Sequence, residues 1–234
     1  MIIPDKNLFI VTSALKPAVG AFSDEQRFEQ TLATLKSIRE KLPEAIVVLS
    51  DISIRPLTDM EREVMQRNCH FMFDLAQDQN TNYCSINGLK SHAENCMLFA
   101  VLMELKNNPS FGKVMSSVKR IFKFSARSEL EDSFDMKEYD GLFGKYVFKK
   151  RIPTWMGVPK LGADHLFITR MFSLCPSLID NYLSVIQQNL NLLGTGLDDT
   201  EHAHFVTIPK HHLVEFDRLH MWGWLAGNGQ IEHY

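Results

Sequence analysis

Residues 8–13 read LFIVTS and residues 46–51 read IVVLSD, and a segment with helical spacing joins these two apolar runs. Each run has the length of a buried strand and ends in polar side chains, which indicates a strand–helix–strand unit. Such a unit typically opens an α/β sheet, in which ligands bind beyond the carboxyl ends of the strands. No glycine-rich loop follows the first strand, so we expect side chains to hold any nucleotide bound there.

The segment between the two runs is predicted to form a helix over residues 24–42. Ser23 and Gln26 have the spacing of a capping box, and Pro43 ends the segment. Five apolar side chains recur at helical spacing and are expected to face the core: Phe28, Leu32, Leu35, Ile38 and Leu42. The polar residues off this stripe are Arg27, Thr31, Thr34 and Ser37. Their simplest interpretation is a solvated face, and the alternative is that Arg27 lies beside the end of the preceding strand.

The composition is that of an ordinary globular protein. A length of 234 residues suits one well-buried domain, with 45% hydrophobic and 23% charged residues. The formal net charge of −3 gives no broad electrostatic footprint for nucleic acid, so no nucleic-acid partner is expected. The basic residues at 145–151 are interpreted as a solvated strand end or, alternatively, as a phosphate-facing patch.

Cysteine usage and hydropathy predict the compartment. The four cysteines form no CxxC pair, which favours reduced core thiols over a zinc site or a disulfide framework. No N-terminal segment has the layout of a signal peptide, and no stretch approaches the roughly 20 apolar residues of a membrane span. We therefore expect a cytoplasmic protein with no membrane span.

Further elements follow the opening unit. Helices are predicted at 58–68 and 91–105, from the capping-box pairs Thr58–Glu61 and Ser91–Glu94, and at 176–194 and 199–205. Strands are predicted at 69–75, 119–125, 146–148, 166–172 and 213–216, and a polar loop at 76–88. This order predicts a single α/β domain over residues 1–234, Rossmann-like, with a mixed, mostly parallel central sheet flanked by helices. Residues 1–125 would form a nucleotide-binding half and residues 126–234 an acceptor-binding half.

Several segments together resemble GT-A type nucleotide-sugar glycosyltransferases, in particular small transferase-like proteins of bacterial and viral genomes. They are residues 9–13 with Arg27, Thr31, Thr34 and Ser37, then KSHAE at 90–94, then FKFSAR at 122–127 with Phe134, and the tail at 222–232. The resemblance implies a GT-A fold and transfer of a sugar from a nucleotide-diphosphate donor to a glycan or other hydroxyl acceptor.

The transfer reaction needs a nucleoside cradle, positive charge on the departing diphosphate and, for inversion, a carboxylate base. Candidates for binding the nucleotide sugar are Thr12, Ser13, Arg27, Asp51, Lys90, Lys123 and Arg127. Three of them keep a structural alternative. Asp51 has the position of a helix cap or turn residue. Arg127 has Glu129 and Asp132 as possible ion-pair partners. Lys90 precedes a predicted helix start, and the alternative there is that Glu94 serves only as the partner in a capping box.

Two carboxylates compete for the catalytic base, Glu201 and Asp164, and we favour Glu201. The histidine-rich end, with His202 and His204, has no zinc-site spacing, and these side chains are interpreted as surface or hydrogen-bonded histidines. The three tryptophans Trp155, Trp222 and Trp224 are candidates for a sugar-binding platform, with core packing as the alternative.

GT-A enzymes usually bind a divalent cation through an Asp-x-Asp pair, and this chain has no such pair. The sequence therefore favours a metal-free site in which Lys and Arg neutralise the diphosphate. The alternative is Mn²⁺ or Mg²⁺ held by scattered ligands such as Asp51 and a C-terminal histidine. Two further functions stay open: a transferase-like protein that binds nucleotide or carbohydrate without turnover, and, last, a nucleotidyltransferase, for which residues 16–20 match the required glycine-rich loop poorly.

Overall fold

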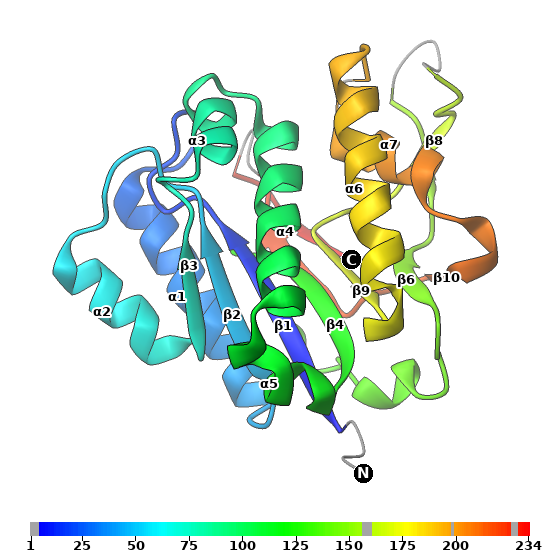
Figure 1. The fold of residues 1–234 in the computed structure, drawn as a ribbon, viewed down its shortest axis with the longest axis horizontal. Coiled ribbons are helices and arrows are strands. Elements are labelled where there is room, and N and C mark those ends of the chain that lie inside the picture. Colours follow the sequence, from blue (N-terminus) through cyan, green and yellow to red (C-terminus); the bar gives the residue numbers. More distant parts are fainter. Residues whose placement is uncertain (1–4, 156–160, 198, 226–228) are drawn as a thin grey trace.

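A computed structural model of the chain describes residues 5–155, 161–197, 199–225 and 229–234. Within these residues a seven-stranded sheet forms the centre of the fold, in the order β10-β6-β9-β4-β1-β2-β3 (Figure 1). Its strands are β1 (Lys6–Ser13), β2 (Ile46–Asp51), β3 (Phe71–Asp74), β4 (Val118–Ser125), β6 (Tyr146–Lys149), β9 (Met171–Leu174) and β10 (Leu213–Phe216). Strand β9 is antiparallel to both of its neighbours, and the other neighbouring pairs are parallel. The predicted mixed, mostly parallel sheet is confirmed.

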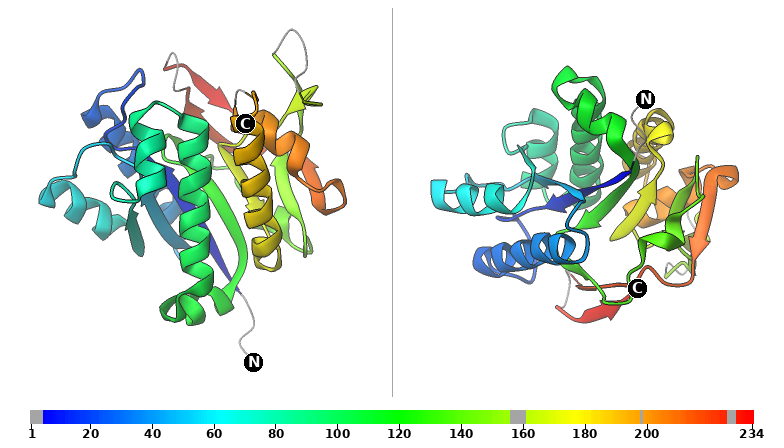
Figure 2. Two further views of the ribbon diagram at one scale, coloured as in Figure 1. Left: turned by 45° about the horizontal axis from the view of Figure 1, so that its top comes forward. Right: turned by 90° about the horizontal axis from the view of Figure 1, so that it is seen from below.

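Helices cover both faces of this sheet. They are α1 (Asp24–Lys41), α2 (Asp59–Asn68), α3 (Gln79–Ile86), α4 (Lys90–Asn107), α5 (Gly112–Ser117), α6 (Ile179–Gly194) and α7 (Thr200–Thr207). Helices α4 and α6 lie on one face, and α1 lies on the other beside a small second sheet (Figure 2). That sheet has the order β12-β11-β5, with β5 (Ser128–Leu130), β11 (Met221–Trp224) and β12 (Ile231–His233). Strands β7 (Ile152–Pro153) and β8 (His165–Leu166) form a separate hairpin.

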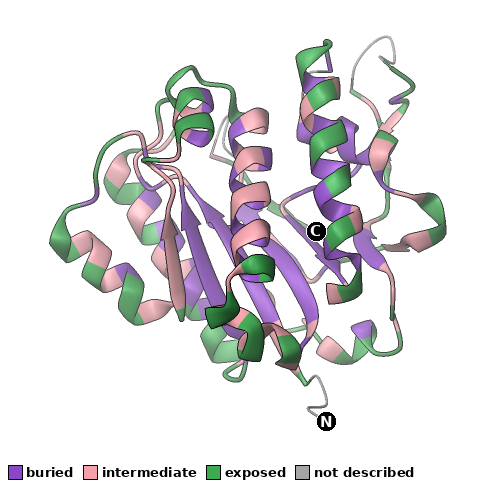
Figure 3. Cartoon of the chain, viewed as in Figure 1, coloured by how far each residue is buried: buried purple, intermediate pink, exposed green. Residues whose placement is uncertain are grey.

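The central strands are buried on both faces (Figure 3). Leu8 and Ile10 of β1 pack into the cluster under α4 and α6, whereas Phe9 and Val11 pack into the cluster under α1. Phe9 also stacks on Phe122 of β4, with ring centroids 4.6 Å apart. Burial on both sides explains why these strands are continuous apolar runs rather than alternating patterns.

The local signals at helix starts had mixed outcomes. The capping boxes of Ser23 with Gln26 and of Thr58 with Glu61 are both confirmed. The predicted Ser91–Glu94 box is wrong: α4 begins at Lys90 after an N-cap, Leu89, that makes no side-chain cap bond. Glu94 does not cap because its carboxylate pairs with Lys123 across the fold.

Two other predictions need correction. The predicted loop at 76–88 contains the two-turn helix α3, whose N-cap Asp78 accepts a hydrogen bond from the Thr81 N–H. The predicted strand at 166–172 is two separate strands, β8 and β9. Between them the Arg170 carbonyl accepts a bond from the Ser125 N–H, at 2.8 Å, and the Thr169 carbonyl accepts one from the Lys123 side chain. The carbonyl groups of residues 169 and 170 therefore bond to the carboxyl end of β4, and this backbone does not continue either strand.

The polar stripe of α1 is not solvated, so that interpretation is wrong. Its members are buried: Arg27, Thr31, Thr34 and Ser37. Of the apolar stripe, Leu35 and Ile38 are buried, whereas Phe28, Leu32 and Leu42 are partly exposed at the margin of the core. The hydroxyls fit the interior because each bonds to a carbonyl one turn back in its own helix, as Thr31 does to Arg27 at 2.8 Å.

Over the described residues, no helix combines the length and apolar character needed to cross a bilayer.

Candidate functional site

A pocket of about 170 Å³ lies at the carboxyl ends of β1 and β4. In register, Thr12 pairs with Ser125 of β4 and Ser13 pairs with Asp51 of β2, so all three strands end at one edge. The chain leaves β1 toward α1 on one face, and it reaches β4 from the other face, where α4 lies, by way of α5 (Figure 2). This change of direction between β1 and β4 is the kind of switch point at which open α/β sheets bind ligands.

The pocket has an apolar wall and a charged wall. The apolar part comes from the segment after β1, the segment after β2 and α4: Pro17, Val19, Phe22, Ile52, Ile54 and Met97. Hydroxyl groups come from Thr12, Ser13, Ser85 and Ser125. The charged groups in the lining are Arg27, Lys90, Arg127 and Glu94. Three cations and one carboxylate make the charged wall suited to an anion.

Arg27 lies in the first turn of α1 and is 7% exposed. Its Nε donates to the Ala14 carbonyl at 3.2 Å, and Nη1 donates to the Gln30 side chain at 3.0 Å. Burial lowers the pKa of Arg27 to about 9, and the positive charge of Arg127 adds to this effect. Among the described residues Arg27 forms no ion pair and its hydrogen bonds go to neutral acceptors, while the charge of Asp51 opposes part of the fall in its pKa.

Arg127 follows β4 and is partly buried. Its Nη1 donates to the Trp224 carbonyl at 3.2 Å. Burial, followed by the charge of Arg170, lowers the pKa of Arg127 to about 10. The structural alternative of an ion pair with Asp132 is not found, because Asp132 pairs with Lys41. Within the described chain, Arg127 makes no ion pair with Glu129 either.

Two desolvated guanidinium groups therefore lie near each other at one pocket, and in the described residues neither forms an ion pair, although the charge of Glu94 acts on Arg127. A buried charge that no ion pair compensates is unfavourable, and two such cations also repel each other. A phosphate group between them would relieve both costs and accept bidentate hydrogen bonds from each.

Lys123 lies outside the pocket lining, although it is on the same strand. Its Nζ is buried, forms an ion pair with Glu94 and donates to the Thr169 carbonyl at 2.7 Å. The partner carboxylate of Glu94 does line the pocket. Burial would raise the pKa of Glu94, but the charge and hydrogen bond of Lys123 outweigh it and lower that pKa. Glu94 is thus an ionised carboxylate at the pocket.

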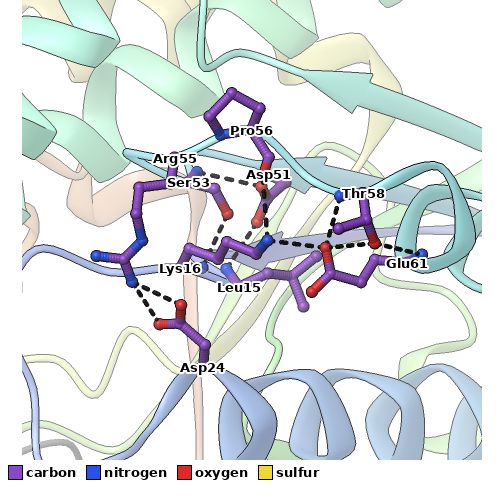
Figure 4. A network of polar contacts seen from close by, with 9 residues as sticks. All are labelled: Leu15, Lys16, Asp24, Asp51, Ser53, Arg55, Pro56, Thr58 and Glu61. Atoms are coloured by element: carbon purple, nitrogen blue, oxygen red, sulfur yellow. Dashed lines mark hydrogen bonds and ion pairs between the residues drawn. The ribbon is translucent and has the colours of Figure 1, made fainter.

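Asp51 also lies outside the pocket lining and is fully buried. Its two carboxylate oxygens accept from the Leu15 N–H at 2.9 Å and the Ser53 N–H at 3.1 Å (Figure 4). Burial raises the pKa of Asp51 above its ordinary value. The structural alternative of a turn residue therefore fits the geometry, and Asp51 anchors the segment that carries the apolar wall.

The two candidate bases differ in environment. Glu201, in the first turn of α7, accepts a hydrogen bond from the Thr169 hydroxyl at 2.9 Å. Burial, then the charges of Glu94 and Asp199, raise the pKa of Glu201 to about 7. Asp164 is 62% exposed on the β7–β8 hairpin and pairs with His165 at 3.0 Å, which lowers its pKa. Neither carboxylate lines the pocket.

The histidines and tryptophans have structural partners. His202 bonds to Thr154 at 2.7 Å and to Asp199 at 2.6 Å. His204 bonds to Tyr182 at 2.9 Å, and burial lowers its pKa to about 4. Trp222 and Trp224 contact each other on β11, whereas Trp155 packs on His202, so the three rings do not form one platform.

A divalent cation does not fit this donor set. In the part of the chain that the structure describes, no three His, Cys, Asp or Glu side chains gather to hold a metal ion. The pocket offers one carboxylate, already paired with Lys123, beside three cationic side chains. Both oxygens of Asp51 are occupied by backbone N–H groups. Mn²⁺ and Mg²⁺ need several free oxygen ligands, so the alternative of scattered metal ligands including Asp51 is unsupported.

The structure thus brings Thr12, Ser13, Arg27, Lys90 and Arg127 to one pocket. It leaves Asp51, Lys123, Glu201 and Asp164 outside the lining. The apolar wall at residues 17–22, 52 and 54 was not predicted as part of the site, and Glu94, in the KSHAE segment, had helix capping as its structural alternative. The wall had a usable signal, because these residues directly follow β1 and β2. For Glu94 the signal was its place in the KSHAE segment, and nothing indicated its pairing with Lys123, which is on a distant strand.

No protein-family model and no curated protein sequence matches the chain. It is similar to core-mannan synthase A from Aspergillus fumigatus in its Mn/GDP form, with a TM-score of 0.49 and 7% identity over 90% of this chain and 73% of that one. It is also similar to a glycosyltransferase involved in glycosylation of the major capsid of PBCV-1 (TM-score 0.48, 7% identity, 90% and 81% covered). A third is the mannosyltransferase Ktr4p from S. cerevisiae (TM-score 0.46, 7% identity, 77% and 59% covered). These structures are GT-A-type glycosyltransferases. With TM-scores below 0.5, the function has to be argued from the pocket.

Proposed function

We propose that this chain is a glycosyltransferase that binds a nucleotide-sugar donor in the pocket at the ends of β1 and β4. The observation that carries the proposal is the pair of desolvated guanidinium groups, Arg27 and Arg127, that flank the pocket and form no ion pair in the described residues. They would hold the diphosphate together with Lys90. The nucleoside would lie against the apolar wall near Phe22 and Ile54, within reach of Thr12 and Ser13.

In this proposal cationic side chains replace the metal ion. During transfer, the bond between sugar C1 and the phosphate oxygen breaks, and its electron pair leaves with the diphosphate. Arg27, Lys90 and Arg127 would stabilise the negative charge that develops there. The acceptor hydroxyl oxygen forms the new bond to C1, and its proton passes to a carboxylate base.

Glu201 is the better candidate for that base, because its pKa of about 7 suits proton transfer near neutral pH. Asp164 fits less well, since it is exposed and paired with His165. Residues 1–125 would provide most of the donor site, with Arg127 added from the second half, and residues 126–234 would provide the acceptor side. The acceptor would be a glycan or another hydroxyl compound.

The test is a thermal-shift titration with uridine, guanosine, cytidine and thymidine diphosphates, each in EDTA and in Mn²⁺. A ligand that binds the folded state raises the melting temperature with its free concentration over Kd. We expect one diphosphate to stabilise the chain equally with and without metal. Stabilisation that requires Mn²⁺ would contradict the cationic replacement, and no response to any diphosphate would contradict the proposal as a whole.

Turnover is measured on the donors of the diphosphate that binds, as release of nucleoside diphosphate by transfer to water. Binding without release from any donor would support the alternative of a transferase-like binding protein. The absence of an Asp-x-Asp pair is the observation that favours this second function.

A further inference from the structure

Glu94 is the one carboxylate among the described residues that line the pocket. It projects from the first turns of α4 and is 26% exposed, so one part of the carboxyl group reaches the pocket while another contacts the interior. The other charged lining groups are cations, which attract phosphate. A carboxylate at the same place repels phosphate and has to serve another part of the ligand.

Lys123 fixes this carboxylate from behind. Its Nζ pairs with Glu94 and also donates to the Thr169 carbonyl at 2.7 Å. Thr169 in turn donates its hydroxyl to Glu201 at 2.9 Å. A continuous set of polar contacts therefore links the pocket carboxylate to the carboxyl group proposed as base.

We infer that Glu94 is a catalytic carboxylate that faces the reacting carbon of the donor sugar, and that Lys123 is the positioning residue that holds it ionised. This inference rests on the proposed function. Glycosyl transfer passes through an oxocarbenium-like transition state, in which C1 and the ring oxygen gain positive charge. A fixed negative charge beside that carbon stabilises the transition state more than the neutral sugar of the ground state. Glu94 forms no bond and moves no proton in this role.

Glu94 and Glu201 would then have different roles, because their surroundings give their carboxyl groups different pKa values. Glu94 stays ionised beside Lys123, whereas Glu201 titrates near neutral pH. Environments that separate two neighbouring carboxyl groups in this way are a recurring feature of sites that cleave glycosidic bonds. The charged or titratable groups that face Glu94 are Lys123 and Arg127 from β4 and its end, Glu201 and His204 from α7, and Tyr182 from α6.

The first test is Glu94→Gln, with Glu215→Gln as a matched control. Glu215 is a partly buried carboxylate, 19% exposed, that pairs with Arg151, and it lies on the edge strand β10, outside the pocket lining. For Glu94→Gln we expect release of nucleoside diphosphate to fall by about 100-fold or more. Binding of the diphosphate alone should stay equal or become tighter, because a repelling charge is gone. The control should keep both properties.

Glu94→Gln leaves the buried Lys123 without a carboxylate partner, so a variant that keeps the fold is also needed. The double change Glu94→Gln with Lys123→Met removes both charges, and replacing a whole buried pair is tolerated better than removing one member. It should melt near the wild-type temperature, bind the diphosphate and fail to turn over. Near wild-type turnover in either variant would overturn the inference.

The single change Lys123→Met tests positioning. Without the lysine the pKa of Glu94 rises, so a smaller fraction is ionised at low pH. In the wild type the pKa of Glu201, about 7, sets the acid limb of the kcat profile, so the effect of the variant should appear below that pH. There a second required deprotonation, that of Glu94, should make the limb steeper, from one proton toward two, at a higher pH than in the wild type. A purely structural lysine would lower the melting temperature and leave the profile unmoved, which would contradict its assigned role.

The outcomes separate this inference from the proposed function. If no diphosphate binds the wild-type chain, the proposed function fails. If a diphosphate binds but no donor is turned over, the binding part stands and the role of Glu94 is overturned.

Discussion

Arg27 and Arg127 hold positions that cost stability unless an anion is bound. Each guanidinium group is desolvated, and within the described residues each is held by neutral oxygen acceptors only. Arg120 provides a contrast on the same strand as Lys123. It is also buried and held by neutral acceptors, but it donates to three of them, the Ser173 hydroxyl and the carbonyls of Lys145 and Leu142, and it lies outside the pocket lining. We therefore expect Arg120 to stabilise the fold, and we expect Arg27 and Arg127 to bind an anionic ligand.

Arg127→Met should separate these two roles. We expect diphosphate binding to weaken by about 10- to 100-fold, the loss of one or two charge-assisted hydrogen bonds. The melting temperature of the free protein should stay equal or rise, since the Trp224 carbonyl keeps a bond from Arg170 at 2.8 Å. Calorimetry and thermal melts measure the two effects.

Arg120→Met is the matched control. It should lower the free energy of unfolding by about 2–4 kcal/mol, because one buried and two partly buried acceptors lose their donor. Diphosphate binding should persist at temperatures where the fold is intact. The opposite pattern, with Arg127→Met unfolding the chain and leaving binding intact, would contradict the assignment of Arg127.

Glu201 gives a pH dependence of stability. Its folded-state pKa of about 7 exceeds that of an unfolded glutamate, about 4.3. Between these values the folded protein retains a proton that the unfolded chain has released, so stability falls as pH rises through this window. Above pH 7 the accumulated loss is about 4 kcal/mol.

Glu201→Gln should remove this loss, since glutamine does not titrate. The free energy of unfolding of the variant should therefore increase relative to that of the wild type as pH rises from about 5 to 8. Urea unfolding at four pH values measures the slope. An unchanged slope would show that Glu201 titrates normally.

Among the secondary-structure elements, the small sheet fixes the position of Arg127. Strand β11 pairs with β5, and the Trp224 N–H donates to the Arg127 carbonyl at 3.0 Å. Gly223 makes this close approach possible. A Cβ atom at that position would lie 2.6 Å from the Ser128 hydroxyl oxygen and 2.8 Å from the Arg127 carbonyl oxygen.

Gly223→Ala should separate β11 from β5 and displace Arg127. We expect a loss of about 1–3 kcal/mol in the free energy of unfolding, together with weaker diphosphate binding. Gly112→Ala is the control, because Gly112 is helical and a Cβ atom there would meet no atom from outside its own helix within 4 Å. It should be neutral or stabilise by up to about 1 kcal/mol. Equal effects of the two changes would contradict the role of Gly223 in this close packing.

Across the whole molecule, charge is segregated. The chain carries a net charge of −3, yet the pocket lining holds three cations and one carboxylate. The arrangement comes from the switch point, where the segments after β1 and β4, the first turn of α1 and the start of α4 converge. Short-range contacts in the pocket, rather than the overall field, would provide the attraction for a diphosphate.

Salt should therefore weaken diphosphate binding only moderately. Raising NaCl from about 0.05 to 0.5 M should reduce affinity several-fold through the exposed Lys90, with desolvated Arg27 and Arg127 screened less. Binding of the uncharged nucleoside should not change. A diphosphate affinity that is independent of salt would contradict a charge-based site.

Features that depend on neighbours in the chain could be predicted from the amino-acid sequence. The runs at 8–13 and 46–51 predicted parallel strands, and the Ser23–Gln26 and Thr58–Glu61 boxes predicted helix starts, because their hydrogen bonds span only three residues. The same spacing at Ser91 and Glu94 predicted a capping box that does not form. The short helix α3 was predicted as a loop, because its segment is rich in polar residues such as asparagine.

Long-range packing established which polar groups are buried and with what they pair. Because of this packing, the polar residues of α1 are buried, and Glu94 forms an ion pair with Lys123. The carboxylate of Asp51 accepts hydrogen bonds from the backbone N–H groups of Leu15 and Ser53. These outcomes depend on contacts between residues far apart in the chain, and the energy of a buried charge depends on its partner. Spacing along one strand or helix carries no information about that partner.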